Sequence, residues 1–436
     1  MNNPSPSSPF NPTVGQAFIL VLAVFAVLTI PVLCLSKNSN NNGNYNDDGA
    51  IYHIPEIRQI HAEWPRLDLR KDALATTAPG YHYLLASISM LTGDSDNALR
   101  WLNWFFSSGV LLAVLFFGCS RVPGGINCLL LLPLAASNFY IKSACWVLTD
   151  NAALLLAILA MMALSAPVTK MSHIKSGGLV AAATFTRQMY VWLLFPMLFR
   201  VFVHREKIDR KQFCFVCAGA LIPVLVLLKL YLAWGGLVPK VWGAMYYTVS
   251  LCPVAYLLSC FGLFGIFYLP LSKWADIKTC FSDHAVHAGL AIGLIIAVAT
   301  PTAHNHAEGR WGGYLWDISD HFPVIGNRSL FFTLGATVGG AVIAILWRQM
   351  RMIDLRREAA LWLSAVFAWA CSSVVNRQVY QRYYEPMTLF FCIFALIQIC
   401  HRRPEKFDRG LAWRLGALWI GQTAITFATV YRAMLG

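Results

Sequence analysis

Charged residues are scarce in this sequence: they make up 13% of its 436 residues, while hydrophobic residues make up 57% and the mean hydropathy is +0.55. So little charge excludes an ordinary soluble protein, which at this length would divide into about two or three domains. The composition instead predicts an all-α polytopic membrane protein, in which apolar spans of about 20 residues take up most of the length.

Several motifs that identify common enzymes are also absent. The sequence has no Walker A loop, Rossmann fingerprint, serine-hydrolase elbow or HExxH motif, so ATP-driven transport and zinc proteolysis lose their usual support. The 12 cysteines lie mostly in apolar runs, and Cys214 and Cys217 have no second Cys/His pair to complete a metal site. His304, His306 and Glu308 form HxHxE without the helical spacing of a zinc site. We therefore expect no metal or other cofactor.

Apolar stretches separated by short polar loops predict a bundle of about 13 transmembrane helices in a single domain over residues 14–436. Residues 1–13 are rich in Ser, Pro and Asn and are expected to be disordered. The first span, 14–35, has no preceding basic residue and no small-residue cleavage site, which favours a retained helix over a removed signal peptide. A first outer loop is expected at 37–97. The later spans are predicted at 98–118, 124–140, 147–166, 174–186, 188–203, 212–233, 246–270, 284–302, 329–347, 358–375, 386–400 and 413–433.

The basic residues predict the orientation of these spans. A net charge of +13 would suggest nucleic acid as the partner of a soluble protein, but here Lys and Arg gather in alternate short loops, the pattern of a cytoplasmic face. The other loops are longer and rich in Trp, Tyr, His, Asp and Arg. We therefore expect the N-terminus inside, the C-terminus outside, and the chemistry on the outer face, in a periplasm or a lumen.

The first outer loop holds much of the scarce charge. A carboxylate beside a membrane is costly to desolvate, so the pair Asp47 and Asp48 asks for a functional reason. Either one is suited to be a general base for a hydroxyl group, and an exposed turn is the alternative. Apolar residues at every third position predict an amphipathic helix from near Pro55, lying on the membrane. His53 precedes this helix and either contacts a substrate or caps it.

Two further polar positions lie at the ends of predicted helices. Thr76 and Thr77 form a turn before the short apolar segment 79–91, which is expected to be an interfacial or re-entrant helix. This turn either lines a sugar or phosphate site or is a plain connection. Asp150 begins a span, so it is either a substrate contact or a charge that complements the helix dipole.

Arg187 and Gln188 interrupt an otherwise apolar stretch, with Trp192 close behind. An arginine at this depth is expensive, and its planar fork suits a phosphate group. Pairing with a carboxylate on another helix is the alternative.

A short outer loop before a late span contains Arg377, Arg382, Tyr383 and Tyr384. Two arginines at one membrane surface suit a lipid-linked phosphate, and interfacial belt residues are the alternative. Trp316 lies in another outer loop beside Asp and His, a setting that suits stacking on sugar rings.

These segments resemble the GT-C superfamily of polyprenol-phosphate-sugar-dependent glycosyltransferases, and they look most like its dolichyl-phosphate-glucose alpha-1,2-glucosyltransferase family. The resemblance rests on an acidic pair followed by aromatic-His-x-Pro, a Thr-Thr-x-Pro-Gly segment with a nearby Tyr, an Arg-Gln pair followed by Trp, and an Arg-Tyr-Tyr segment. The matching residues here are Asp47-Asp48, Tyr52-His53-Ile54-Pro55, Thr76-Thr77-Ala78-Pro79-Gly80-Tyr81, Arg187-Gln188 with Trp192, and Arg382-Tyr383-Tyr384. The acidic pair is offset by one or two residues, so both aspartates stay candidates and the nearer Asp48 is preferred.

The resemblance implies an inverting glycosyltransferase in a GT-C-like bundle. Asp48 or Asp47 would deprotonate an acceptor hydroxyl, and Arg187, Arg377 and Arg382 would hold the phosphate of a polyprenyl- or dolichyl-phosphate sugar, with glucose favoured. The acceptor would be lipid-linked or a glycan, and no metal is required because phosphate is a good leaving group. The implied substrate contacts are His53, Thr77, Asp150, Gln188, Trp192, Trp316, Tyr383 and Tyr384.

Two other classes of function remain open from the residues. A flippase-like transporter of lipids or solutes would be favoured by paired broken helices in two halves of the chain. A structural subunit of a membrane complex would leave the polar outer loops unexplained. The sugar, the linkage, the carrier lipid, and the choice between endoplasmic reticulum and bacterial inner membrane are not determined by the sequence.

Overall fold

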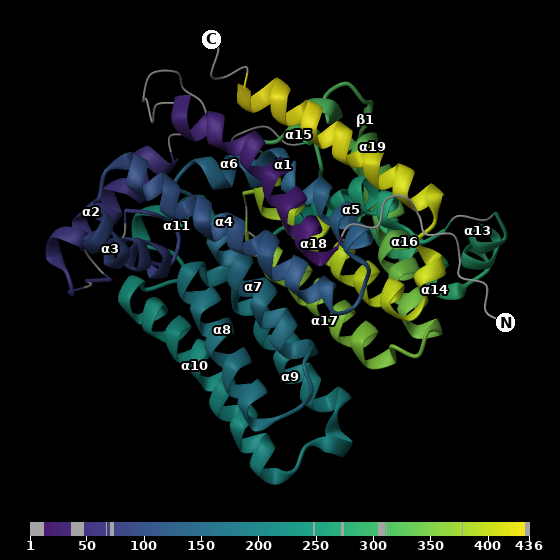
Figure 1. Cartoon of the computed structure of the whole chain (residues 1–436), viewed down its shortest axis with the longest axis horizontal. Helices are drawn as coiled ribbons and strands as arrows, with labels where there is room; N and C mark the ends of the chain where they lie inside the picture. Colours follow the sequence, from purple (N-terminus) through teal and green to yellow (C-terminus); the bar gives the residue numbers. More distant parts are fainter. Residues whose placement is uncertain are drawn as a thin grey trace.

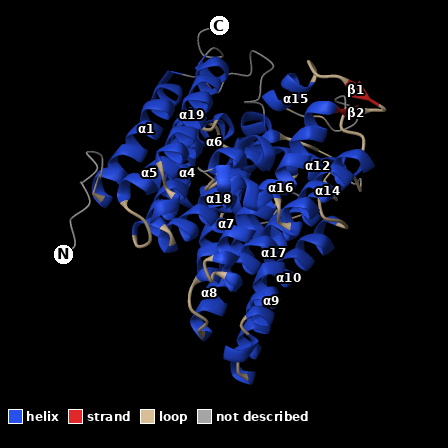
Figure 2. Cartoon of the chain, turned by 90° about the vertical axis from the view of Figure 1, so that its right-hand side faces the viewer, coloured by secondary structure: helices blue, strands red, loops and turns tan. Residues whose placement is uncertain are grey.

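Helices account for almost all of the structure. The computed structural model describes residues 13–35, 48–66, 68–69, 74–246, 249–271, 274–303, 310, 312–376 and 378–431. Within these ranges the only sheet is a two-stranded antiparallel hairpin, β1 (Val324–Ile325) with β2 (Arg328–Ser329). Figure 2 shows this hairpin at the edge of the helical bundle.

Five helices in the described part of the chain are long and apolar enough to cross a membrane. They are α1 (Val14–Leu35), α4 (Asp96–Cys119), α10 (Arg210–Trp234), α16 (Leu330–Met352) and α18 (Gln381–Arg402). The chain is thus an all-α membrane protein, as its composition predicted, and the bounds of α1 coincide with the predicted first span. The count of about 13 crossings and their orientation stay predictions.

Shorter helices fill the space between and around these five. They are the π-helical turn η1 (Asp48–His53), α2 (Ile54–Glu63), α3 (Gly80–Thr92), α5 (Gly124–Ala135), α6 (Asn138–Cys145), α7 (Asp150–Ser165), α8 (Lys170–Thr186), the 3-10 helix η2 (Gln188–Leu193), α9 (Leu194–Val203), η3 (Arg205–Lys207), α11 (Lys240–Tyr246), α12 (Cys252–Cys260), η4 (Phe261–Gly265), η5 (Ile266–Tyr268), α13 (Trp274–Phe281), α14 (His284–Ala299), α15 (Tyr314–Ser319), α17 (Arg356–Ser373), η7 (Pro404–Lys406), α19 (Arg409–Thr426) and η8 (Phe427–Tyr431).

One predicted span is wrong as a straight helix. The stretch 124–140 breaks between α5 and α6, which meet at an angle of 72°. Pro133 lies in the last turn of α5 and Ser137 caps α6, accepting from the backbone N–H of Tyr140. A proline followed by a good capping residue ends one helix and starts another, although both sides are apolar.

The break predicted at Arg187 and Gln188 is present. Helix α8 ends at Thr186, and Arg187 is extended, with φ −148° and ψ 116°. The chain then continues as η2 and α9. Figures 1 and 2 show α8, α9 and α10 extending together away from the rest of the bundle. Arg187 therefore lies where this group of helices joins the remainder.

Helix α18 runs through the centre of the bundle and is buried along most of its length. It contacts α5, α6, α7, α12, α16 and α17, which are spread over residues 124–373. Its first turn carries Arg382 and Tyr383, so the central helix fixes the position of both side chains.

Helix α3 starts in close contact with the end of α8. A Cβ atom at Gly80 would lie 2.5 Å from the carbonyl oxygen of Phe185, closer than packing permits. Only glycine lets the two backbones approach this far. The approach brings the turn at Thr76 and Thr77 against Arg187.

Candidate active site

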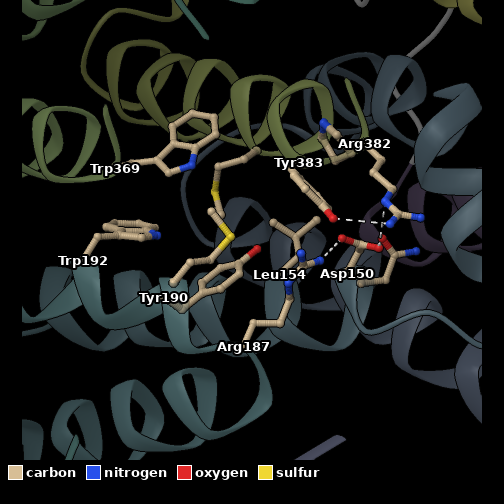
Figure 3. Close-up of a pocket in the computed structure, with 12 residues that line it drawn as sticks. Asp150, Leu154, Arg187, Tyr190, Trp192, Trp369, Arg382 and Tyr383 are labelled. Atoms are coloured by element: carbon tan, nitrogen blue, oxygen red, sulfur yellow. Dashed lines mark hydrogen bonds and ion pairs between the residues drawn. The ribbon is translucent and has the colours of Figure 1, made fainter. Parts of the chain in front are cut away.

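Four charged side chains from distant segments meet at one end of α18. Nη2 of Arg382 donates to Oδ2 of Asp48 over 2.6 Å, and Nε of Arg382 lies 3.9 Å from Oδ2 of Asp150. Arg187 forms an ion pair with the other oxygen of Asp150. Figure 3 shows Asp150 between the two arginines. The break after α8, the first residue of α7, the first turn of α18 and the start of η1 supply these four groups.

The four charges balance and are mostly removed from water. The side chains of Arg187 and Asp150 are 7% and 11% exposed, and that of Arg382 is 14% exposed. Asp48 is 33% exposed, so it is the carboxylate that a substrate reaches most easily. Burial alone would raise the pKa of Asp48, but the charge and hydrogen bond of Arg382 outweigh burial and hold it below its ordinary value of 3.8. Asp48 is therefore ionised at neutral pH.

Tyr383 lies between the two arginines. Its ring centroid is 4.4 Å from the guanidinium carbon of Arg187 and 5.2 Å from that of Arg382. Tyr380 stacks on Arg382 from another direction, at 4.5 Å. These cation–π contacts hold both planar forks in fixed positions while their N–H edges stay available for hydrogen bonds.

The charged cluster lines a cavity of about 110 Å³. This polar cavity is bordered by Asp48, His53, Thr77, Asp150, Arg187, Arg382 and Tyr383, among others. A second, apolar cavity of about 410 Å³ shares Thr76, Thr77, Arg187 and Tyr383 with it, and its other walls include Leu227 and Val191. The ion-pair cluster thus lies beside a larger apolar space, with Arg187 in the wall of both cavities.

His53 lines the polar cavity and connects it to a buried polar chain. Nδ1 of His53 lies 2.8 Å from Nε2 of His82, and the two rings stack with centroids 5.0 Å apart. Nδ1 of His82 lies 3.3 Å from Oε1 of Glu56, whose other oxygen accepts from the backbone N–H of Ala75 over 2.8 Å. Burial lowers the pKa of His53 to about 4, and it lowers that of His82 well below 6.5. Both rings are therefore neutral at pH 7.

Gln188 holds the Thr76–Thr77 turn beside Arg187. Its Oε1 accepts from the backbone N–H of Ala78 over 2.9 Å, and its Nε2 donates to the carbonyl oxygens of Thr76 and Leu237. The amide is thus occupied by backbone, and Gln188 shapes the site. Trp192 is buried and lines a small cavity together with Asp150 and Arg187, whose lining side chains Figure 3 shows.

Two residues predicted as substrate contacts, Trp316 and Tyr384, do not line these cavities. Trp316 is buried among Tyr256 and Phe332, and its Nε1 donates to the carbonyl oxygen of Val379. Tyr384 is buried against Trp369 and Tyr256. Neighbouring residues on a helix point about 100° apart, so Tyr383 faces the site while Tyr384 faces the core.

Some predicted residues lie outside the described part of the chain: Asp47, Arg377, His304, His306 and Glu308. Among the residues that are described, no three His, Cys, Asp or Glu side chains form a group that could hold a metal ion. Sequence reasoning missed the pairing of Glu56 with His82. The only available signal was the three-residue spacing of His53 and Glu56 at a helix start, and nothing in the sequence connected either of them to His82.

No family model matches this sequence, and a search of curated proteins found no match. The class of function is therefore argued from the site itself.

Proposed function

We propose that this protein is an inverting, membrane-embedded glycosyltransferase of the GT-C type, which moves a sugar from a polyprenyl-phosphate or dolichyl-phosphate carrier to an acceptor hydroxyl. One observation carries the proposal: a mostly buried cluster of two arginines and two carboxylates lines a polar cavity that shares part of its wall, including Arg187, with an apolar cavity. A lipid-linked phosphosugar needs these two surroundings side by side.

The two arginines are suited to the donor phosphate. Arg187 borders both cavities, and Arg382 borders the polar one, so a phosphate at their junction would have its lipid in the apolar space and its sugar in the polar space. Planar guanidinium groups bind phosphate oxygens through two N–H groups at once. They would also stabilise the negative charge that grows on the phosphate as it departs.

Asp48 is suited to be the base. It would take the proton of the acceptor hydroxyl while that oxygen forms a bond to the anomeric carbon. The bond from the anomeric carbon to the phosphate oxygen breaks, and its electron pair leaves with the polyprenyl phosphate. Attack from the face opposite the phosphate inverts the anomeric carbon. Because Arg382 pairs with Asp48, a phosphate that draws Arg382 away would raise the basicity of Asp48 when the donor is bound.

A lipid transporter is the second candidate, because the chain contains two broken helices, although both lie in its first half and not one in each half. The bend between α5 and α6 and the break at Arg187 both interrupt apolar stretches of the chain. Transport would leave the bond between sugar and phosphate intact, whereas the glycosyltransferase breaks it.

The test reconstitutes the purified full chain in liposomes with dolichyl-phosphate glucose carrying a labelled sugar, and with lipid-linked oligosaccharide extracted from membranes. The proposal expects label in the oligosaccharide, with the anomeric configuration opposite to that of the donor. Liposomes without protein control for spontaneous transfer. Intact donor moved between leaflets, with no transfer from glucose, mannose or other sugar donors, would replace the proposal with the transporter.

A further inference from the structure

Glu56, His82 and His53 form a row of polar contacts that has no role in the reaction proposed above. All three side chains are buried: Glu56 and His82 are 1% and 0% exposed, and His53 is 7% exposed. The row begins at the carboxylate of Glu56, on α2, and ends at His53 in the wall of the polar cavity. The π-helical turn η1 has a wide i→i+5 repeat, which puts Asp48 and His53 on one face of the turn.

The carboxylate determines where each ring carries its proton. At 3.3 Å the contact between Glu56 and Nδ1 of His82 is long for a hydrogen bond, so the carboxylate acts chiefly through its negative charge. That charge favours a proton on the nitrogen that faces it. In neutral His82, Nε2 is then the acceptor, and Nδ1 of His53 must supply the proton of their 2.8 Å contact. The remaining nitrogen of His53, Nε2, therefore carries no proton.

We propose that His53 is a hydrogen-bond acceptor for the substrate: its Nε2, held unprotonated by His82 and Glu56, accepts from a sugar hydroxyl in the polar cavity. This inference rests on the proposed function and adds the orientation of the sugar. The hydroxyl belongs either to the acceptor or to the sugar of the donor.

The same arrangement separates the two kinds of ligand group inside one cavity. An unprotonated ring nitrogen repels phosphate oxygens and accepts from hydroxyl groups, whereas Arg187 and Arg382 attract phosphate oxygens most strongly. His53 therefore marks the hydroxyl side, next to Asp48, and the arginines mark the phosphate side. A ligand turned the wrong way would put its phosphate oxygens against the lone pair of His53 and leave both arginines without the phosphate charge.

Glu56→Gln reverses the direction of the row without touching the cavity. Glutamine at position 56 carries no negative charge to favour a proton on Nδ1 of His82, and with its oxygen kept at the N–H of Ala75 its amide nitrogen faces Nδ1. His82 then carries its proton on Nε2 and donates to His53, whose proton moves to Nε2. The nitrogen that His53 presents to the polar cavity thus changes from a hydrogen-bond acceptor to a donor. Glu63→Gln is the matched control, because Glu63 is an exposed carboxylate on the same helix.

The first measurement is the ¹⁵N chemical shift of the histidine rings in the detergent-solubilised full chain at pH 7, with His53→Gln used for assignment. The wild-type protein and Glu63→Gln should show neutral His53 protonated on Nδ1, and Glu56→Gln should show it protonated on Nε2. Charged His53, or a proton on Nε2 in the wild type, overturns the proposal. This readout does not depend on sugar transfer, so it stands apart from the fate of the proposed function.

The second measurement is the KM for each substrate in the transfer assay with dolichyl-phosphate glucose and lipid-linked oligosaccharide. Loss of one neutral hydrogen bond predicts a rise of about tenfold in one KM for both Glu56→Gln and His53→Gln. A rise in the oligosaccharide KM assigns the hydroxyl to the acceptor, and a rise in the donor KM assigns it to the donor sugar. Unchanged KM values for both substrates overturn the proposal, while a wild type without transfer defeats the proposed function and leaves the tautomer result intact.

Discussion

Arg382 and Asp48 are joined by a hydrogen bond of 2.6 Å although 334 residues separate them in sequence. The contact ties the first turn of the central helix α18 to the start of η1. It also pairs the proposed base with one of the proposed phosphate ligands before any substrate is bound. In the proposed mechanism, binding of the donor phosphate and activation of the base would be coupled through this one guanidinium group.

Replacing the arginines by lysine tests the phosphate role while keeping the charge. Arg187→Lys and Arg382→Lys lose the planar fork that binds two oxygens at once, so the KM for dolichyl-phosphate glucose should rise about tenfold or more. Arg58→Lys is the control, because Arg58 pairs with Asp94 and Asp96 on the exposed surface. A donor KM that stays the same in both site variants would remove the phosphate role.

The buried histidines predict a loss of stability in acid. His53 has a pKa of about 4 when folded and about 6.5 when unfolded, so between these values the folded state binds fewer protons. The contribution of neutral, buried His53 to the free energy of unfolding is fully present above pH 6.5. It is lost as the pH falls toward 4, up to about 3 kcal/mol. The lowered pKa of His82 acts in the same direction.

The measurement is the Tm of the detergent-solubilised protein between pH 7 and pH 4.5. His53→Gln should show a smaller drop in Tm over this range than the wild type, because one of the two buried rings no longer titrates. Equal drops in the two proteins would contradict a neutral, buried His53.

The positions of the long helices could be predicted because each one corresponds to a long apolar stretch of the sequence. The range 14–35 coincides with α1, and the break at Arg187 was visible as a charge inside an apolar stretch. The break between α5 and α6 was missed, since Pro133 and Ser137 lie within a run that is apolar on both sides. Local signals of this kind are weak against the apolar background.

Candidate site residues could be predicted from the sequence where a charged side chain lies in an apolar setting. They could not be predicted where a contact depends on how two separate helices pack. Asp48, Arg187 and Arg382 stood out because charged groups beside a membrane need a reason. The contact of His82 with Glu56 depends on how α2 packs on α3, and no sequence spacing encodes it. Trp316 was predicted from composition, which does not reveal the direction of a side chain.

The close packing at Gly80 predicts that the protein does not tolerate a larger residue at this position. Gly80→Ala puts a methyl group against the carbonyl oxygen of Phe185, so α3 and the Thr76–Thr77 turn must move away from Arg187. We expect a loss of about 1–3 kcal/mol in stability and a raised donor KM. Gly178→Ala is the control in α8, because a Cβ there meets nothing within 4 Å. A Tm for Gly80→Ala equal to that of the control would contradict the close approach.

The apolar cavity predicts a dependence on the length of the lipid. Leu227→Trp fills part of the 410 Å³ space and should lower transfer from dolichyl-phosphate glucose several-fold, with less effect on a short-chain citronellyl-phosphate glucose. Leu232→Trp on the same helix is the control, because Leu232 is 69% exposed on the outer surface of α10. Equal losses for long and short donors would argue against a lipid in this cavity.

The most direct measurement of the central claim is the transfer rate of Asp48→Asn at saturating dolichyl-phosphate glucose and oligosaccharide. Asparagine keeps the shape and a contact for Arg382 but cannot take a proton, so the rate should fall by about 10²–10⁴-fold. Asp317→Asn, which removes an exposed carboxylate outside the cavities, should keep the wild-type rate. Wild-type transfer by a folded Asp48→Asn protein would contradict the assignment of Asp48 as the base.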